Sequence, residues 1–329
     1  MALDGKLLAR AKAAHKEKRR VNDENYERRL ENAYVRVPKI RALDAEIRAT
    51  MSDLVSAALT PGSDGRIEDI RLRNIELQGE RRRELSSAGF PKNYLDDEYA
   101  CPDCRDTGYV GTQICECLIE LYKEEQKASL SSLFKLGSET FDSFDLSFYD
   151  DAPATEIGIS PRRSMEIVYE TCVEYARKFG KNSMNLFFNG APGLGKTFLS
   201  ACIARVVADN GHSVVYDTAS SVFSKFEEAK FSRSDDLEEV RGDIKRYLTC
   251  NLLILDDLGT EMTTAFTISA LYEVINTRLT SGGKTIVSSN LTLLDLHRRY
   301  SEQIMSRIEG EYQTLTFRGD DIRKKRNML

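Results

Sequence analysis

The chain contains 329 residues, of which 41% are hydrophobic and 30% are charged, and it carries a formal net charge of −5. This length predicts two or three domains, and this hydrophobic fraction is enough for a large buried core. The small net charge excludes a uniformly basic protein that would bind nucleic acid over its whole surface. The sequence has no run of about 18 apolar residues and therefore predicts no membrane-spanning helix.

The N-terminus lacks the apolar stretch of a secretory signal, so we expect a cytoplasmic protein whose seven cysteines are not joined in disulfides. Positive charge is concentrated at the two ends, with seven Lys or Arg in residues 1–20 and five in residues 318–329. Either end could contact the phosphates of a nucleic acid. A solvated helix face and a solvated tail would have the same composition, so both interpretations stand.

Residues 1–100 are expected to form a helical N-terminal region. Apolar residues recur at three- and four-residue spacing between Ile40 and Ala58, and a second apolar stripe begins at Ile67. Residues 60–65, between the two stripes, are turn formers. Two helices with a tight break predict an antiparallel helical hairpin. This hairpin either stands by itself or packs against the rest of the protein.

Two pairs of cysteines predict a small zinc ribbon, which together with the helix after it occupies residues 101–135. The pairs are separated by ten residues and consist of Cys101, Cys104, Cys115 and Cys117. Four thiolates around one tetrahedral ion make a closed structural Zn²⁺ site, and Gly108 suits a tight knuckle turn. Such a module has little core of its own, so metal binding would supply most of its folding free energy. Redox-active thiols and an iron–sulfur cluster are the alternatives.

The remaining cysteines and the histidines are not expected to bind this ion. Three cysteines lie in apolar patterns that predict buried positions: Cys172, Cys202 and Cys250. No histidine is expected near the cluster, and none is predicted to be a ligand: His15, His212 and His297.

Residues 136–160 form an aromatic-rich connector, and residues 161–329 form a domain in which short apolar runs alternate with amphipathic helices. The predicted strands are Leu186–Phe188, Val214–Tyr216, Leu252–Leu255, Thr285–Ser288 and Thr314–Phe317. Strands that alternate with helices indicate a mainly parallel sheet covered on both faces. The expected fold class is therefore α/β, preceded by a helical segment and a small zinc ribbon.

A complete phosphate-binding motif of the form GxxxxGK[ST] follows the first of these strands. It consists of Gly190, Ala191, Pro192, Gly193, Leu194, Gly195, Lys196 and Thr197. A helical stretch comes next, and this strand–loop–helix context is the one that the motif requires. Glycines let backbone N–H groups surround phosphate oxygens at a helix N-terminus. We expect Lys196 to reach the β- and γ-phosphates of ATP, and Thr197 to bind Mg²⁺ through its hydroxyl.

About sixty residues after this motif, an apolar strand ends in two carboxylates, Asp256 and Asp257. A buried strand of a parallel sheet delivers such residues to the C-terminal edge, beside the phosphate loop. Asp256 is predicted to support the Mg²⁺ shell, and Asp257 is predicted to orient or deprotonate the attacking water. The two motifs together predict an ATPase.

With these motifs the domain resembles the AAA+ ATPases. The next strand ends at Asn290, where the resemblance implies the sensor-one residue that holds the attacking water or the γ-phosphate; the alternative is an Asn that starts a turn. Arg307, on a short predicted helix, falls where these ATPases carry an arginine finger that reaches into a neighbouring subunit. Arg298 and Arg299 are rivals for that role, and a surface salt bridge is the alternative for Arg307.

The C-terminus departs from the broad AAA+ pattern, because only about a dozen residues follow the last predicted strand and leave no room for the usual helical lid. Arg323 lies there, either as a sensor-two arginine or as part of the basic tail. The lidless branch includes the helicase loaders DnaC and DnaI and the transposition helper IstB. Residues 252–259, 288–290 and 303–307 resemble that branch, and the resemblance covers about residues 140–329.

A zinc module ahead of a lidless core resembles the DnaC/DnaI-type loaders. The resemblance implies a weak, regulatory ATPase of the primosome that uses ATP, Mg²⁺ and Zn²⁺, forms a nucleotide-dependent homo-oligomer and loads a hexameric replicative DNA helicase onto single-stranded DNA. It also implies contact with an initiator protein and an N-terminal region that grips the helicase. An IstB-like transposition helper and a nucleotide-gated adaptor for a non-DNA partner are the alternatives. A metabolic kinase would need an acceptor pocket, for which the sequence has no motif.

Overall fold

The computed structural model describes residues 3–60, 64–133, 139–152, 158–231 and 237–326. The chain forms two compact units. The first, which we call the sheet unit, consists of Met1–Ala11 and Ile119–Leu329, and the second, the hairpin unit, consists of Lys12–Leu118. Two helices cross the borders of these units along the sequence, α1 (Gly5–Arg36) and α4 (Glu116–Leu133).

The sheet unit contains a five-stranded sheet in the order β4–β5–β6–β3–β7, and every neighbouring pair of strands is parallel. Its strands are β3 (Asn185–Asn189), β4 (Val214–Thr218), β5 (Leu252–Leu258), β6 (Lys284–Ser289) and β7 (Tyr312–Thr316). The predicted α/β fold with a parallel sheet is confirmed, and each predicted strand overlaps an observed one. The largest difference concerns β5, which ends at Leu258 rather than Leu255, and the last strand begins at Tyr312 rather than Thr314.

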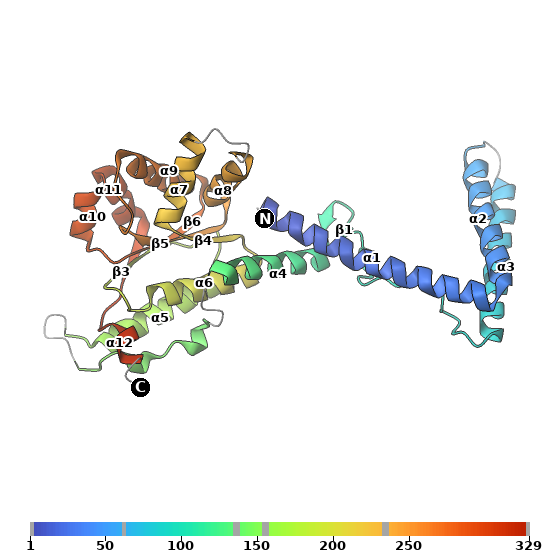
Figure 1. The fold of residues 1–329 in the computed structure, drawn as a ribbon, viewed down its shortest axis with the longest axis horizontal. Helices are drawn as coiled ribbons and strands as arrows, with labels where there is room; N and C mark the ends of the chain where they lie inside the picture. Colours follow the sequence, from blue (N-terminus) through green and yellow to red (C-terminus); the bar gives the residue numbers. More distant parts are fainter. Residues whose placement is uncertain (1–2, 61–63, 134–138, 153–157, 232–236, 327–329) are drawn as a thin grey trace. The chain divides into compact units, whose positions relative to one another are not determined.

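Helices cover both faces of this sheet (Figure 1). One face is covered by α5 (Pro161–Arg177) and α6 (Lys196–Asp209). The other face is covered by α7 (Ala219–Phe231), α8 (Leu237–Thr249), α9 (Ala265–Ser281), α10 (Leu293–Arg299) and α11 (Glu302–Glu311). Two 3₁₀ turns, η1 (Phe141–Ser143) and η2 (Leu146–Phe148), and a short helix, α12 (Ile322–Arg326), complete the unit.

The central strand β5 shows why the strands read as continuous apolar runs. Successive side chains of a strand point to opposite faces of the sheet. Leu253 and Leu255 belong to the core beneath α7–α11, whereas Leu252 and Ile254 belong to the core beneath α5 and α6. Because both faces are buried, every position of the strand must be apolar until the chain reaches the polar edge of the sheet.

The hairpin unit is built around α2 (Pro38–Ala58) and α3 (Asp64–Ser87), which pack side by side. Lys39, near the start of α2, pairs with Glu84, near the end of α3, at 2.8 Å. The ion pair between Asp44 and Arg81, also at 2.8 Å, follows the same antiparallel direction. Part of the predicted turn between them, residues 61–63, lies outside the described residues. A two-stranded antiparallel ribbon, β1 (Tyr109–Val110) with β2 (Gln113–Ile114), follows in the same unit.

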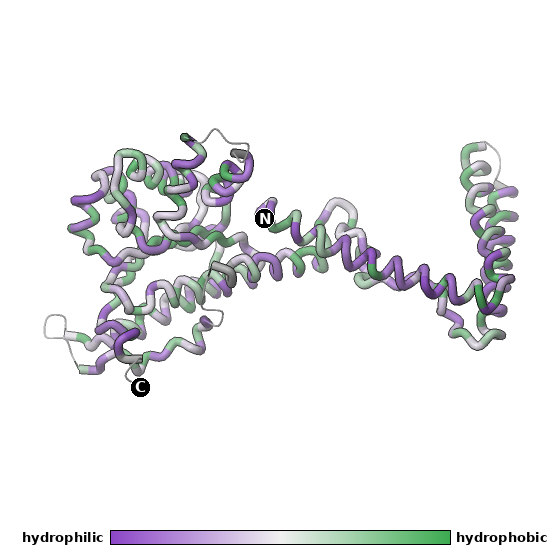
Figure 2. The backbone as a smooth tube through the Cα atoms, viewed as in Figure 1, coloured by the Kyte–Doolittle hydropathy of each residue, from purple (hydrophilic) through white to green (hydrophobic). Residues whose placement is uncertain are grey.

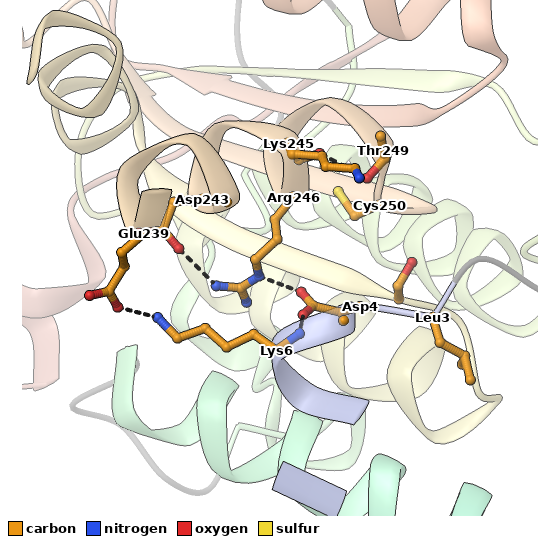
Figure 3. A pocket seen from close by; sticks show the side chains of 12 residues that line it. Leu3, Asp4, Lys6, Glu239, Asp243, Lys245, Arg246, Thr249 and Cys250 are labelled. Carbon is orange, nitrogen blue, oxygen red and sulfur yellow. Dashed lines mark hydrogen bonds and ion pairs between the residues drawn. The ribbon is translucent and has the colours of Figure 1, made fainter. Parts of the chain in front are cut away.

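The first turns of α1 pack against α8 and α4 within the sheet unit. Leu7 and Ala11 are buried there. The Asp4 carboxylate pairs with the guanidinium of Arg246 on α8, and the backbone N–H of Asp4 donates to the hydroxyl of Tyr122 at 3.0 Å. A cavity of about 530 Å³ lies beside this ion pair (Figure 3). The start of the basic N-terminal segment is therefore anchored, whereas the sequence suggested only a nucleic-acid contact or a solvated face.

Within the described ranges, no helix is both long and apolar enough to cross a membrane. The longest of these helices is α1, with 32 residues. Hydrophilic residues dominate it along its length (Figure 2). Its length thus reflects an exposed, charged helix rather than an apolar span.

Candidate functional site: a phosphate loop and a four-cysteine cluster

The phosphate loop joins β3 to α6 at the C-terminal edge of the sheet. Two of its positions have room only for glycine, because the segment after β7 packs closely against them. A Cβ atom on Gly190 would lie 2.5 Å from the carbonyl oxygen of Phe317, and one on Gly193 would lie 1.9 Å from Oδ1 of Asp321. Both glycines also have positive φ angles, of 151° and 79°, that disfavour a side chain. The segment after β7 therefore packs directly against the loop.

Lys196 is the first residue of α6, and its side chain is almost fully buried at the loop. Its Nζ atom donates hydrogen bonds to the carbonyl oxygens of Gly190 at 2.6 Å and Ala191 at 2.8 Å. Since an ammonium group has three protons, one remains for a ligand. Burial lowers the pKa of Lys196, and the nearby carboxylates of Asp257 and Asp256 oppose that shift. The two carboxylates thus balance the charge of the buried ammonium group.

Asp256 lies at the centre of the polar edge, with a side chain that is 3% exposed. Its Oδ2 atom accepts a hydrogen bond from the hydroxyl of Thr197 at 3.0 Å and another from the hydroxyl of Tyr216. Its Oδ1 atom accepts a hydrogen bond from the hydroxyl of Ser288. The carboxylate therefore joins β5 to α6, β4 and β6. This places the two candidate magnesium ligands, Thr197 and Asp256, in direct contact.

Asp257 and Asn290 meet beside this centre. The side-chain amide of Asn290 donates to Oδ1 of Asp257 at 3.2 Å, and the hydroxyl of Ser288 accepts from the backbone N–H of Asp257 at 3.0 Å. Asp257 has a φ angle of 55°, which is uncommon for a residue with a side chain and is typical of functional sites. Burial and the charge of Asp256 raise the pKa of Asp257, while the hydrogen bond from Asn290 opposes the increase.

Arg323 lies close to this group of residues. It is the second residue of α12, and the backbone N–H of Ile322 donates to the carbonyl oxygen of Gly193 at 3.0 Å. The positive charge of Arg323 contributes to the lowered pKa of Lys196 and opposes the raised pKa of Asp257. Its charge therefore lies near both Lys196 and Asp257.

Arg307 is held on α11 by residues of α9. Its Nη2 atom donates to Oδ1 of Asn276 and to the hydroxyl of Tyr272, both at 3.1 Å, and its guanidinium lies 4.8 Å from the centre of the Tyr272 ring. The two rival arginines have different surroundings. Arg298 pairs with the carboxylate of Asp295 at 3.5 Å, and Arg299 binds the loop after β5 through the carbonyl of Glu261.

The connector ahead of α5 contributes two aromatic residues to the phosphate loop. Tyr149 is fully buried, and its hydroxyl donates to the carbonyl oxygen of Leu194 at 2.9 Å. A Cβ atom on Gly195 would lie 3.1 Å from both this hydroxyl and the ring of Phe144. Residues 134–138 and 153–157 of the connector region lie outside the described residues.

The hairpin unit brings the four predicted cysteines together. Their Sγ atoms all lie within 4.8 Å of one another. Cys101 and Cys115 are 3.7 Å apart, and Cys104 and Cys117 are 3.5 Å apart. Four sulfurs bound to one tetrahedral Zn²⁺ at about 2.3 Å would be separated by about 3.8 Å. The donor set and its spacing therefore fit a structural zinc ion.

The knuckle turn of this cluster holds a sulfur atom with a backbone donor. The N–H of Gly108, a residue with a φ angle of 77°, points to Sγ of Cys104 at 3.4 Å. Burial opposes ionisation of the Cys104 thiol, but hydrogen bonds from Gly108 and the neighbouring thiols lower its pKa to about 6, whereas burial and the same group of thiols raise the pKa of Cys117. A thiolate is the form that binds a metal ion.

One expectation about the cluster is wrong, because His15 does lie beside it. The Nε2 atom of His15, on α1, is 3.6 Å from Sγ of Cys117. Asn22, further along the same helix, donates to the Asp106 carboxylate at 3.2 Å, and that carboxylate also accepts the N–H of Cys101 at 2.9 Å. Contacts of this kind orient metal ligands. Since α1 is about a hundred residues away in the sequence, spacing alone gave no sign of it.

Sequence reasoning also missed two residues of the nucleotide site, Tyr216 and Ser288. Both lie in predicted strands, near the end from which Asp256 also projects. Both residues are polar and lie close to the C-terminal end of an apolar strand. Because these ends share one edge of a parallel sheet, this position could have indicated that both side chains lie near Asp256.

We expect purified protein to contain about one zinc ion per chain, because the four thiolates close a tetrahedral site. Cys104→Ser should reduce the bound zinc at least tenfold and destabilise the hairpin unit, as measured by elemental analysis and thermal unfolding. Cys202→Ala, which alters a buried cysteine of the sheet unit, is the matched control and should retain the metal. Metal-free wild-type protein after gentle purification would contradict the assignment.

Comparison with known proteins identifies the family of the sheet unit. Residues 130–328 match the model of the IstB-like ATP binding proteins. The replicative helicase loader DnaC of Buchnera aphidicola subsp. Baizongia pistaciae is 29% identical over 153 residues, which are 46% of this chain and 61% of that protein. DnaC of Escherichia coli strain K12 is 22% identical over the same shares. The chain thus spans about three fifths of the length of the curated relatives it matches.

Solved structures of the helicase loader DnaC and of DnaI are also similar to this chain. The DnaC structure has a TM-score of 0.44 at 20% identity and covers 55% of this chain and 97% of its own. The DnaI structure has a TM-score of 0.44 at 20% identity and covers 60% of this chain and 99% of its own. The family model covers more than half of the sequence, and the chain therefore belongs to the family of IstB-like ATP binding proteins.

Proposed function

We propose that this chain is an ATP-dependent loader of a hexameric replicative DNA helicase onto single-stranded DNA. The observation that carries the proposal is the presence, in one chain, of a complete phosphate-loop site and a separate hairpin unit with exposed apolar side chains. The first would bind and hydrolyse ATP, and the second would bind the partner. The relatives that are named replicative helicase loaders support the same choice of partner.

The residues of the sheet unit fit ATP with Mg²⁺. The N–H groups of the phosphate loop and the remaining proton of Lys196 would hold the phosphates. The Thr197 hydroxyl and the Asp256 carboxylate are oxygen ligands of the kind that Mg²⁺ prefers. The ion would neutralise charge that develops on the phosphates. Asp257 would orient the attacking water and accept its proton, and Asn290 would hold that water or the γ-phosphate.

Two arginines would complete the reaction. Arg323 would act on the phosphates within its own chain, as its influence on Lys196 and Asp257 supports. Arg307 would act as the finger that enters the site of the next subunit in a nucleotide-dependent homo-oligomer. A guanidinium suits this role because its charge is permanent and its fork matches a phosphate. Hydrolysis would be weak in the isolated chain, because an isolated chain lacks the neighbour's finger.

The hairpin unit would bind the helicase through the surface of α2 and α3. Five large apolar side chains on α2, directly after it or on α3 are more than half exposed: Met51, Val55, Leu59, Leu72 and Ile75. Met51, Val55 and Leu59, the residue that caps the C-terminus of α2, recur every four residues, which places them on one face of this segment. Exposed apolar side chains gathered on one surface are typical of protein interaction sites. Leu59 is the most exposed of them, at 82%.

Single-stranded DNA would bind an aromatic patch of the sheet unit formed by Phe231, Phe266 and Lys230. The two rings lie 5.8 Å apart, and Phe231 is 65% exposed. The Nζ atom of Lys230 lies 5.7 Å from the centre of one ring and 5.1 Å from the other. Stacking rings combined with a cation suit single strands, because every base has a face that can stack and every nucleotide carries a phosphate.

The transposition helper and the non-DNA adaptor remain the alternatives. The sheet unit does not separate a loader from a transposition helper, since both share it. The four-cysteine cluster and the hairpin favour the loader. Stimulation of ATP hydrolysis by single-stranded DNA would count against an adaptor for a non-DNA partner. The cytoplasmic location, the contact with an initiator protein and the division into residues 1–100, 101–135, 136–160 and 161–329 stay predictions.

The loader proposal predicts a stable complex with the replicative helicase of the source cell. We expect the complex in size-exclusion chromatography with light scattering, with a stability that differs between ATP-bound and ATP-free protein. Val55→Glu should weaken it at least tenfold, because a charge would be buried at the apolar surface. ATP binding should remain unchanged in that variant.

Ala42→Glu is the matched control, since it adds the same charge to an exposed position of the same helix, about two and a half turns before Met51. It should leave the complex intact. Absence of a complex with wild-type protein, both with and without ATP, would refute the loader proposal in favour of the two alternatives.

ATP hydrolysis should decline at acidic pH as Asp257 becomes protonated, because only the carboxylate can accept a proton from water. The hydrogen bond from Asn290 holds the pKa of Asp257 down against burial. Asn290→Ala removes that bond, so the acidic limb of the kcat profile should move to higher pH, whatever the height of the profile.

Asn189→Ala provides the control for this pH shift. Its amide donates to the carbonyl of Leu291 at 2.7 Å, at the end of the neighbouring strand. The control should leave the acidic limb in place, whatever its effect on the rate. If the acidic limb of the kcat profile stays in place in the Asn290→Ala variant, or moves to lower pH, the result contradicts the role given to Asp257.

A further inference from the structure

Glu261 is a buried carboxylate in the loop between β5 and α9, four residues after Asp257. Its side chain is 6% exposed. The Oε2 atom accepts the backbone N–H of Gly259 at 2.8 Å, and the Oε1 atom accepts the hydroxyl of Tyr300, which is itself buried. Burying a carboxylate costs free energy unless its oxygens are hydrogen-bonded. Here each oxygen binds a different segment of the chain, so the side chain bridges them.

The first of these segments begins at the nucleotide site. The hydroxyl of Thr260 donates to the carbonyl oxygen of Asp257 at 2.9 Å, and its backbone N–H points to the same oxygen at 3.3 Å. Asp257 has the left-handed backbone conformation that is costly for a residue with a side chain. A change at Asp257 that relieved this strain would therefore move the loop up to Glu261.

The second segment leads to the helix of the proposed arginine finger. Tyr300 lies between α10 and α11, next to Ser301, the residue that precedes the first turn of α11. Arg299 strengthens the same junction, because its Nε atom donates to the hydroxyl of Thr263 at 2.5 Å and its guanidinium also binds the carbonyl of Glu261. Arg307 lies about two turns further along α11. The loop after β5 thus holds the start of the helix that carries Arg307.

We propose that Glu261 is a positioning residue that couples Asp257 to α11, so that the nucleotide bound by one chain sets how that chain presents Arg307 to its neighbour. The inference rests on the proposed ATPase function with Arg307 as finger. Hydrogen bonds are directional, and packed cores shift between discrete arrangements rather than deform smoothly. A change in the loop therefore reaches Tyr300 as a displacement of the start of α11.

The alternative is that the hydrogen bond between Tyr300 and Glu261 only fastens the loop to the start of α11 and transmits no change from the nucleotide site. Its loss would then lower stability without changing the response of α11 to nucleotide. Tyr300→Phe removes the hydroxyl and leaves the ring, which packs in the core with Leu296 and Ile304. Glu261→Gln keeps the shape of the other partner and removes its charge. The two variants therefore test the link from both sides with little change in packing.

The first experiment measures hydrogen exchange of the α11 amides in the full chain, with and without a non-hydrolysable ATP analogue. In wild-type protein we expect nucleotide to change the protection of α11. Tyr300→Phe and Glu261→Gln should lose most of that change and still bind the analogue within about twofold of wild type, since neither residue contacts the phosphate loop. Tyr175→Phe should keep the change, because this buried hydroxyl has no hydrogen-bond partner among the described residues.

The second experiment measures kcat in a double-mutant cycle with Arg307→Ala. Tyr300→Phe should lower kcat about tenfold in the wild-type background, as expected for a bond to a buried charged group. It should have little further effect once Arg307 is absent, because the two residues act through one route. The KM for ATP should stay the same in both backgrounds.

The proposal is overturned if nucleotide binds wild-type protein without changing the protection of α11, or if Tyr300→Phe retains the wild-type response. A loss of kcat that is equal in both backgrounds would overturn it as well. A different result would refute the proposed function: wild-type protein that binds no ATP, or that does not hydrolyse ATP in an assembly. If ATP binds without hydrolysis, the exchange experiment alone decides the coupling.

Discussion

The carboxylate of Asp256 is the contact on which the nucleotide site depends. Three hydroxyls, from Thr197, Tyr216 and Ser288, point to this one buried group and come from a helix and two flanking strands. A buried anion requires such donors, and these donors in turn fix the edge of the sheet against the phosphate loop. Ser288 also accepts the backbone N–H of Asp257, and the pairing of β5 with β6 shifts register between Leu255 and Leu258, so that Asp257 meets Asn290 beside this group.

The outer parts of the site are held by the rest of the sheet unit. The segment after β7 reaches the phosphate loop through Asp321 and Ile322, and the connector reaches it through Tyr149. Short stretches of chain thus pack against the phosphate loop from two directions. The backbone of the loop is therefore held by segments that precede and follow the strands of the sheet.

Much of this arrangement could be predicted from the sequence, because local patterns carry it. The phosphate loop, the strand before Asp256 and the cysteine pairs each place their residues through spacing alone. The contacts of Tyr216, Ser288 and His15 could not be predicted in that way, since each depends on which strands or helices become neighbours. Glu261 and Tyr300 belong to the same class: 39 residues separate them, and only the packing of α11 against the sheet brings them together.

The most direct test of the account measures ATP binding by titration calorimetry on wild-type protein and on Lys196→Ala. Lys196 is buried at the phosphate loop, where its charge is balanced by Asp256 and Asp257, so its loss should remove the main attraction for phosphate. We expect wild-type protein to bind ATP with Mg²⁺ and the variant to bind at least a hundredfold more weakly while remaining folded. Equal affinity in the two proteins would contradict the claim that this loop is the nucleotide site.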